Sequence, residues 1–220
     1  MISHIVREIV MRTFIALAFV ASVSLSQEVY QIPFAAKGNT IELTVANTSP
    51  IAATEVSVVA TGAPSWISLS QKTVTIDQLS AKSEKSATFS FSVDKIAAVN
   101  KEETLTFTIK SKSGETWTKE IKIKVSPPEK FELFQNYPNP FNPTTTICYQ
   151  LTRDSKVQLR VYNLVGQEVV TLVDGEKQAG YHQEVFDATR FASGMYIYRI
   201  VYINESGKQS SDKKTILVLK

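Results

Sequence analysis

The residue types that most often carry chemistry are scarce in this chain. Beyond residue 26 it has one cysteine, Cys148, and one histidine, His182. A thiol next to an imidazole can act as a nucleophile, but catalysis also needs a group that orients the histidine and donors that stabilise an oxyanion. Neither is visible around these residues, which both fall in expected strands. We therefore expect no catalytic residue and no enzyme, with a Cys148-dependent hydrolase as an alternative.

Carboxylates and tryptophans are the other candidates for binding. Asp94, Glu102 and Glu103 flank an expected turn, where they could touch calcium weakly, but they lack the spacing of a calcium-binding loop. The sequence also lacks cysteine and histidine ligands at zinc spacing, so we expect no metal and no cofactor. Trp66 and Trp117 could form an aromatic platform for sugar rings. Both lie in register with core positions, however, and burial is the favoured interpretation.

Composition and charge describe a globular chain without a nucleic-acid-binding surface. The 220 residues are 43% hydrophobic, which is enough to form a core. The formal net charge is +3, from 24 basic and 21 acidic residues, and the two signs are interspersed along the chain. Because no basic stripe is present, we expect no nucleic acid among the partners. With Cys148 alone beyond the N-terminus, stability must come from packing and not from an internal disulfide.

Residues 1–26 have the layout of a secretory signal peptide. Two arginines precede an apolar run at residues 14–25, which ends in small residues. This run is about a dozen residues long, against the roughly 20 that a membrane-spanning helix requires. We expect cleavage after Ser26, with translation starting at Met1 or at Met11, and a mature protein that is soluble once exported.

Residues 27–126 alternate between apolar and polar side chains with a period of two, which predicts strands with one face in a core. The expected strands include residues 41–45, 56–58, 66–69, 74–76, 89–93, 105–109 and 117–125. Short strands separated by turn residues, without an amphipathic helix, are typical of an immunoglobulin-like β-sandwich. The segment also resembles immunoglobulin-like accessory domains of secreted bacterial enzymes and surface proteins, through Asn47 and Trp66.

A second β-sandwich is expected after a proline linker at residues 127–130, because paired prolines cannot continue a strand ladder. Within residues 131–220 the expected strands are 147–151, 157–161, 168–172, 182–186, 194–203 and 214–219. Asp174-Gly175 and Ala179-Gly180 are typical of hairpin turns. The run 194–203 is apolar on both faces, which favours a central strand covered by a second sheet. The predicted fold class is therefore all-β, with two consecutive β-sandwich domains after a signal peptide.

Four blocks of residues 131–220 together resemble the C-terminal sorting domain of the type IX secretion system. They are YPNPFNP, YNLVGQEV, ASGMYIYR and the closing KKTILVLK, in the order that the family has. The resemblance assigns shape and recognition, without chemistry, to the sorting-motif residues Pro138, Asn139, Pro140, Gly166, Gly194, Tyr196 and Lys214. Glycine permits a positive φ in the turn at Gly166 and a close backbone approach at Gly194, while proline stiffens the chain. These residues could equally serve only to stabilise the sandwich.

The resemblance also implies a route and a set of partners. The chain would reach the periplasm of a Gram-negative bacterium, where an outer-membrane translocon would recognise the folded sorting domain. A surface sortase would remove that domain, and the product would be released or joined to a lipopolysaccharide anchor. For the first domain we expect a noncatalytic structural or adhesive role, with a protein or glycan ligand. A carbohydrate-binding accessory module is the alternative.

Overall fold

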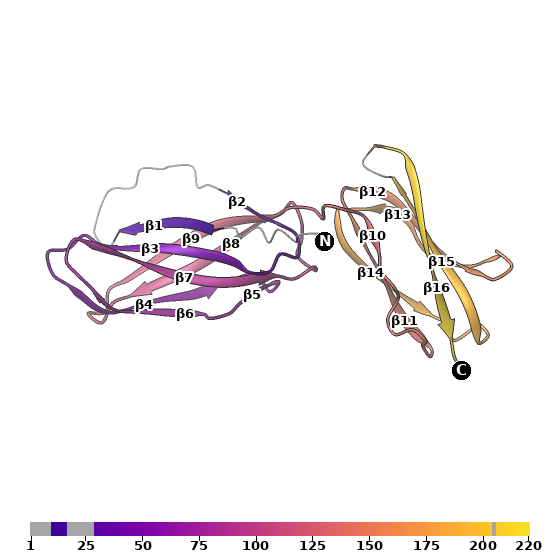
Figure 1. The fold of residues 1–220 in the computed structure, drawn as a ribbon, viewed down its shortest axis with the longest axis horizontal. Coiled ribbons are helices and arrows are strands. Elements are labelled where there is room, and N and C mark those ends of the chain that lie inside the picture. The colour runs from indigo at the N-terminus through magenta and orange to yellow at the C-terminus, as the bar shows by residue number, and fades with distance from the viewer. Residues whose placement is uncertain (1–9, 17–28, 204–205) are drawn as a thin grey trace, which may run out of the picture. The chain divides into compact units, whose positions relative to one another are not determined.

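The computed structural model describes residues 10–16, 29–203 and 206–220, and all of the regular elements in these residues are β-strands. The prediction of an all-β chain is confirmed. The chain separates into two compact units, Met1–Ser126 and Pro127–Lys220, which are described in turn (Figure 1). Within the described ranges, no helix has the length and apolarity that crossing a membrane requires.

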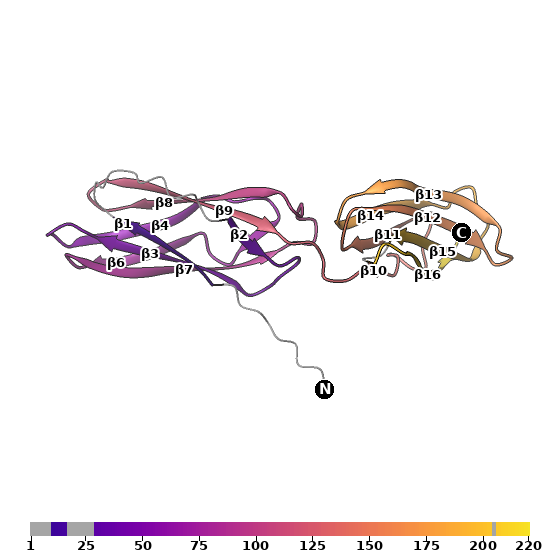
Figure 2. The same ribbon diagram turned by 90° about the horizontal axis from the view of Figure 1, so that it is seen from above.

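The first unit is built from two sheets whose orders are β1-β3-β7-β5 and β2-β9-β8-β4-β6. Its strands are β1 (Val10–Ala16), β2 (Val29–Ile32), β3 (Asn39–Asn47), β4 (Ala53–Gly62), β5 (Ile67–Leu69), β6 (Thr73–Leu79), β7 (Ser83–Val93), β8 (Glu102–Lys110) and β9 (Thr116–Val125). In Figure 2, β8 and β9 lie in one layer and β3 and β7 in the other. The strands expected between residues 39 and 126 are confirmed as β3 to β9.

Two strands near the N-terminus were not expected. β1 pairs in parallel with β3, and β2 pairs in parallel with β9. β2 is only four residues long, and so short a run shows too little alternation to predict a strand. β1 falls inside the predicted signal peptide, residues 1–26, whose other residues lie outside the described ranges. The signal peptide stays a prediction.

The core of the first unit follows directly from the alternation in its strands. Phe89 of β7 and Phe107 of β8 are fully buried, and their ring centroids lie 5.0 Å apart between the two sheets. Such tilted aromatic pairs stabilise a core beyond the area that they bury. At one end, the buried Asn47 amide nitrogen donates hydrogen bonds to the carbonyls of Ile51, Leu79 and Ser80. The Asn47 side chain links the turn after β3 to the end of β6, because it donates hydrogen bonds to carbonyl groups at both places.

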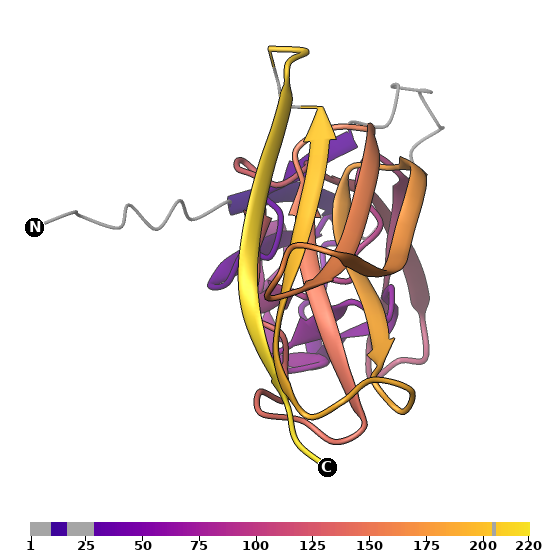
Figure 3. The ribbon, with the colours of Figure 1, turned by 90° about the vertical axis from the view of Figure 1, so that its right-hand side faces the viewer.

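The second unit is a sandwich of a three-stranded sheet, β10-β11-β14, and a four-stranded sheet, β13-β12-β15-β16. Its strands are β10 (Glu132–Leu133), β11 (Thr144–Leu151), β12 (Ser155–Asn163), β13 (Glu168–Lys177), β14 (Gly180–Asp187), β15 (Gly194–Ile203) and β16 (Gln209–Val218). All strand pairs are antiparallel. The two sheets form separate layers in Figure 1, and β15 and β16, the two most yellow strands of Figure 3, run side by side.

The central position of β15 is confirmed, because it lies between β12 and β16. Its inner face is buried through Tyr196, Tyr198 and Ile200, which pack against residues of the other sheet. Its outer face is less covered than expected, since Met195 is half exposed. The second sheet covers only the inner face of β15, so the apolar residues of its outer face are not covered by another sheet.

The predictions of hairpin turns at Asp174-Gly175 and at Ala179-Gly180 are both wrong. The two-residue strand β10 was not predicted. Asp174 and Gly175 lie inside β13, opposite Gln158 and Val157 of β12. A glycine that follows an aspartate suits a tight turn, but here the cross-strand pairing of a long β13 overrides that local preference. The segment before Gly180 joins β13 to β14, which belong to different sheets. It is therefore a corner between the sheets and not a hairpin.

Candidate recognition site

The strand register separates the two residues that a cysteine-dependent enzyme would need. Cys148 of β11 lies opposite Gln183, whereas His182 lies opposite the neighbouring Tyr149. Because side chains alternate between the faces of a sheet, Cys148 is on the outer face and His182 on the inner one. The His182 ring stacks on Tyr149, with centroids 5.1 Å apart, and its Nε2 lies 2.8 Å from the Gln178 carbonyl oxygen. Because they lie on opposite faces of the sheet, Cys148 and His182 do not form a thiol–imidazole dyad.

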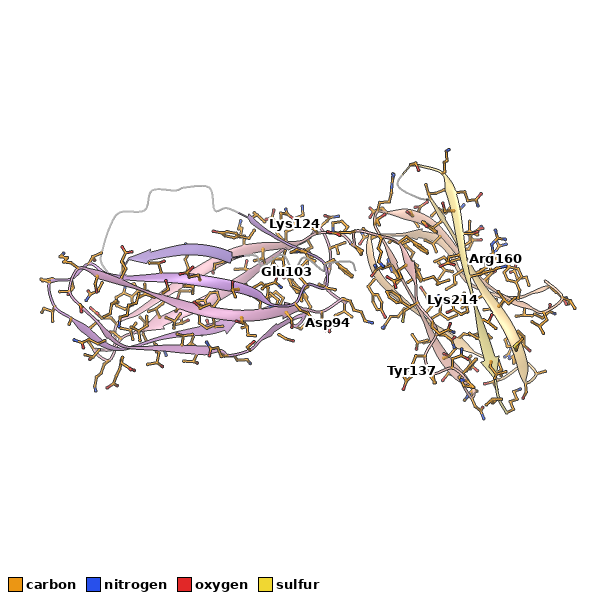
Figure 4. All side chains as sticks on the ribbon, viewed as in Figure 1. Asp94, Glu103, Lys124, Tyr137, Arg160 and Lys214 are labelled. Carbon is orange, nitrogen blue, oxygen red and sulfur yellow. The ribbon has the colours of Figure 1, made fainter. Side chains whose placement is uncertain are left out.

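Two of the candidate ligands of the first unit, Asp94 and Glu103, are engaged by other groups. Asp94 accepts a hydrogen bond from the Ile96 N–H at 3.0 Å, while Glu103 pairs with Lys101 at 3.0 Å. Figure 4 shows Asp94 at the end of β7 and Glu103 on β8. No group of three or more histidine, cysteine or carboxylate side chains occurs at metal-binding spacing in the described residues.

The two tryptophans do not form a shared exposed platform. Trp66 is only 7% exposed and belongs to the core of the first unit. Trp117 lies opposite Ile109 and is partly buried against the same core. The burial expected for Trp66 is confirmed, while Trp117 packs against the core and keeps part of its surface exposed.

The proline block, residues 137–143 (YPNPFNP), has a defined backbone path in the second unit. The peptide bonds before Pro138, Pro140 and Pro143 are cis. Tyr137 exchanges two backbone hydrogen bonds with Thr146 of β11, both 3.0 Å long. At the other end of the block, the Phe141 N–H donates to the Leu217 carbonyl and the Phe141 carbonyl accepts from the Leu219 N–H. The block therefore bridges the first long strand of one sheet and the last strand of the other.

Asn139 attaches the middle of the proline block to β16 through its side chain. Its Oδ1 accepts a hydrogen bond from the Leu217 N–H at 3.0 Å, and its Nδ2 donates to the Thr215 carbonyl at 3.4 Å. The Gln135 Nε2 donates to the same carbonyl at 2.9 Å. A carboxamide offers one donor group and one acceptor, as a peptide unit does. Asn139 thus pairs with the outer edge of β16 in place of a neighbouring strand.

A buried polar junction fixes the chain just before the proline block. Asn136 is 2% exposed, and its backbone N–H donates to the Tyr198 hydroxyl at 3.0 Å. That hydroxyl in turn donates to the Phe134 carbonyl at 2.7 Å. The Asn136 Nδ2 donates to the Pro138 carbonyl and to the Thr145 hydroxyl oxygen, at 3.0 and 2.9 Å. Burial raises the pKa of Tyr198 well above its ordinary value, so the hydroxyl stays neutral and keeps its proton for the Phe134 carbonyl.

Sequence reasoning missed this junction because its members lie far apart in the chain. Asn136 and Tyr198 are separated by 62 positions, and only the sandwich brings them together. One signal was available: Asn136 stands directly before the proline block, where a polar residue is needed to satisfy the backbone of a turn.

Of the remaining sorting-motif residues, Gly166 lies in a turn, Gly194 starts a strand, and Tyr196 and Lys214 lie within strands. Gly166 has a φ of 82° in the turn after β12, and Gly194 has a φ of 144° at the start of β15. The expected close backbone approach at Gly194 is wrong, because a Cβ there would meet nothing within 4 Å. Its positive φ is the reason for glycine. Tyr196 is buried, with its hydroxyl donating to the Ala192 carbonyl at 3.0 Å, and Lys214 lies opposite Tyr198 on β16.

The fold and the site define a class: an all-β protein of two sandwich-like units, the second of which presents a stiff proline block against its last strand. Residues 135–218 match the family described as "Secretion system C-terminal sorting domain". The chain thus carries a type IX secretion C-terminal sorting domain, and the prediction from the four sequence blocks is confirmed. This domain implies that the protein is secreted through that system.

Solved structures resemble the chain only distantly. Dimeric latent PorU from Porphyromonas gingivalis is 16% identical with a TM-score of 0.35, over 75% of this chain and 16% of the PorU chain. The chain therefore spans about one sixth of that protein's length. A protein of unknown function from Porphyromonas gingivalis W83 is 16% identical with a TM-score of 0.35, over 88% of this chain and 96% of the other. No curated protein matches the chain.

Two buried tyrosines of the second unit should respond differently to loss of their hydroxyl. We expect Tyr198→Phe to lower the free energy of unfolding by about 1–3 kcal/mol, because it leaves the Asn136 N–H and the Phe134 carbonyl buried without their partner. Tyr149→Phe should leave it unchanged or raise it, since the Tyr149 hydroxyl is buried without a hydrogen-bond partner among the described residues. Amide hydrogen exchange of β15 measures both effects. Equal destabilisation by the two variants would contradict the role given to Tyr198.

Asn139 should protect one particular backbone amide. We expect Asn139→Ala to speed hydrogen exchange at the Leu217 amide by about fivefold, the equivalent of one lost hydrogen bond of roughly 1 kcal/mol. The Leu219 amide is the internal control, because it donates to the Phe141 carbonyl instead. Asn139→Asp keeps the acceptor and should largely preserve the protection of Leu217. Unchanged exchange at Leu217 in the alanine variant would show that the hydrogen bond from the Leu217 N–H to the Asn139 Oδ1 is not formed in solution.

Proposed function

We propose that the second unit, residues 131–220, is the sorting signal of an exported protein, which we call the address, and that the first unit is its cargo. The folded address is recognised by the outer-membrane translocon of type IX secretion after signal-peptide export to the periplasm of a Gram-negative cell. The observation that carries this proposal is the sorting-domain match at residues 135–218. The product then appears outside the cell or on its surface.

The structure of the second unit supports recognition of a folded domain. The proline block is held by backbone pairs at both of its ends and by Asn139 in its middle. A segment already fixed in one conformation loses little entropy when a partner binds it. Removal of the address by a surface sortase, and attachment of the cargo to a lipopolysaccharide anchor, are the later steps of the route that we propose.

For the first unit we propose a noncatalytic, structural or adhesive role. Its core is closed by tightly packed aromatic and aliphatic side chains. The burial of Trp66 and the partial burial of Trp117 weaken the aromatic argument for a carbohydrate-binding role, which also rests on the resemblance to accessory domains. In the second unit, the opposite faces of Cys148 and His182 speak against a cysteine-dependent hydrolase. A protein ligand is the partner that we propose for the cargo.

Deleting residues 131–220 should leave the cargo in the periplasm, because the translocon would then have nothing to recognise. Fractionation into periplasm, surface and medium measures the outcome, with the full chain as the reference. Both tryptophans lie in the first unit, so their fluorescence reports whether the truncated cargo is folded. A folded truncated form that reaches the medium at the level of the full chain would refute the address.

The noncatalytic role predicts an ordinary thiol at Cys148. We expect thiol-directed probes to label Cys148 no faster than a cysteine in an unstructured peptide, because no imidazole lies on its face of the sheet to activate it. His182→Ala is the matched control and should leave the labelling rate unchanged. A rate that is raised in the native chain and drops in the His182→Ala chain would establish a reactive dyad and overturn the proposal.

A further inference from the structure

In the second unit, the outward residues of β11 and β14 are uncharged between two carboxylates. One is Glu132 of β10, which lies opposite Gln150 and 3.2 Å from Lys130, and the other is Asp187 of β14, which lies opposite Thr144. The outward residues of β11 and β14 face each other as the pairs Thr146 with Val185, Cys148 with Gln183, and Gln150 with Tyr181. Tyr137 extends the first of these rows through its backbone pair with Thr146. We call this surface the neutral face and define it by Tyr137, Thr146, Cys148, Tyr181, Gln183 and Val185. Asp187 stands at its end, and hydrogen bonds from Thr189 lower the pKa of that carboxyl.

The outer face of the other sheet has the opposite character. Arg160, Arg199 and Lys213 stand side by side across β12, β15 and β16. Arg160 also lies 3.4 Å from Glu168 and 3.6 Å from Asp174, both on the edge strand β13. Figure 4 shows Arg160 on the four-stranded sheet and Tyr137 beside β11 of the other. The lack of charge on the neutral face is thus not a general property of the unit.

Two large side chains of the neutral face are strongly exposed. Tyr137 is 83% exposed and Val185 is 64% exposed. The backbone of Tyr137 is nevertheless fixed by its two hydrogen bonds to Thr146. An exposed aromatic on a fixed backbone has few rotamers to lose and a large area to bury, which is why tyrosine is common at binding hot spots. Depletion of charge around such a residue is the compositional signature of an interface core.

We propose that the neutral face is the surface through which the second unit docks onto a protein of the export machinery, with Tyr137 as its aromatic anchor. This inference rests on the proposed function and adds the surface that the translocon reads. It also gives the proline block a role beyond the fold, because the block sets the position of Tyr137 at the rim of this face.

The charge distribution favours a protein as the occupant over an anionic lipid headgroup. A phosphate-bearing headgroup requires lysine or arginine side chains, and in this unit the cross-strand row of such residues lies on the opposite sheet. The neutral face instead offers hydroxyl and carboxamide groups around apolar side chains. Its match is a protein surface that is uncharged at its centre and carries hydrogen-bonding groups.

Two lysines placed on the neutral face test the inference. In the full chain, we expect Gln183→Lys combined with Val185→Lys to reduce the amount of protein outside the cell at least tenfold, with the protein retained in the periplasm. Both positions are exposed on β14, so the new charges remain solvated in the free protein and cost energy only on docking. Gln209→Lys combined with Ser211→Lys adds the same charge at exposed positions of β16, in the other sheet, and should be exported normally.

A second variant covers the case in which the lysines disturb folding. Tyr137→Ala removes a side chain that is 83% exposed, so it should leave the resistance of the purified chain to protease unchanged while lowering export. Tyr137→Phe keeps the ring and should restore most of the export. Full export of Tyr137→Ala together with full export of the double-lysine variant would overturn the inference.

The other outcomes separate this inference from the proposed function. If deletion of residues 131–220 blocks export but the neutral-face variants are exported normally, the address stands and the docking surface is wrong. If the deletion itself does not block export, the proposed function fails first. Equal loss of export by the β16 control variant would show that added charge anywhere on the unit is harmful, and would also overturn the inference. So would a wild-type dimer in sedimentation that the neutral-face lysines convert to monomer, because the occupant would then be a second copy of the chain.

Discussion

The hydroxyl of Tyr198 is bonded on both sides to the segment that leads into the proline block, as acceptor from Asn136 and as donor to Phe134. Tyr198 belongs to the centre of the four-stranded sheet, while Phe134 continues the three-stranded sheet by donating its N–H to the Cys148 carbonyl. The Tyr198 hydroxyl group therefore reaches across the core and fixes the position of one sheet relative to the other. Inside a core, a polar group that is fully satisfied specifies a single arrangement more sharply than apolar contact does.

The placement of the proline block follows from this junction. Once Asn136 is fixed, its carboxamide positions the Pro138 carbonyl, and Asn139 meets the backbone of β16. Prolines add stiffness and remove N–H groups that an exposed loop would otherwise have to satisfy. The backbone of Tyr137 then has a defined position, although its side chain is strongly exposed. The path of this exposed segment is thus fixed in part by Asn136, which is itself buried.

Much of the fold was predictable from alternation alone. The runs around Leu105 and Leu159 mark buried strands because each keeps its apolar side chains on one face. The run around Ile200 is instead marked as a central strand by apolar residues on both faces. Alternation does not record pairing partners, so the two-residue β10 and the crossing from β13 to the other sheet were not predictable. The short-range preference of Asp174-Gly175 for a turn was misleading for the same reason.

The candidate site was predictable only in part. Asn139 and the prolines stand out as a block because their types are unusual in a strand-rich chain. Asn136, Thr145 and Tyr198 read as ordinary residues of a β-protein, and only the three-dimensional structure makes them one network. Cys148 and His182 lie on opposite faces because their strands pair with an offset of one residue between them. Their spacing along the chain does not predict this register.

The pairing of Asn139 and Phe141 with the last strand has a further consequence for the edge of its sheet. An open strand edge is a template onto which another chain can add. Residues 215–219 of that edge are occupied by the proline block, and the stretch that precedes them carries Asp212, Lys213 and Lys214, charges that discourage stacking. Both features disfavour the addition of a second copy of the chain at this edge.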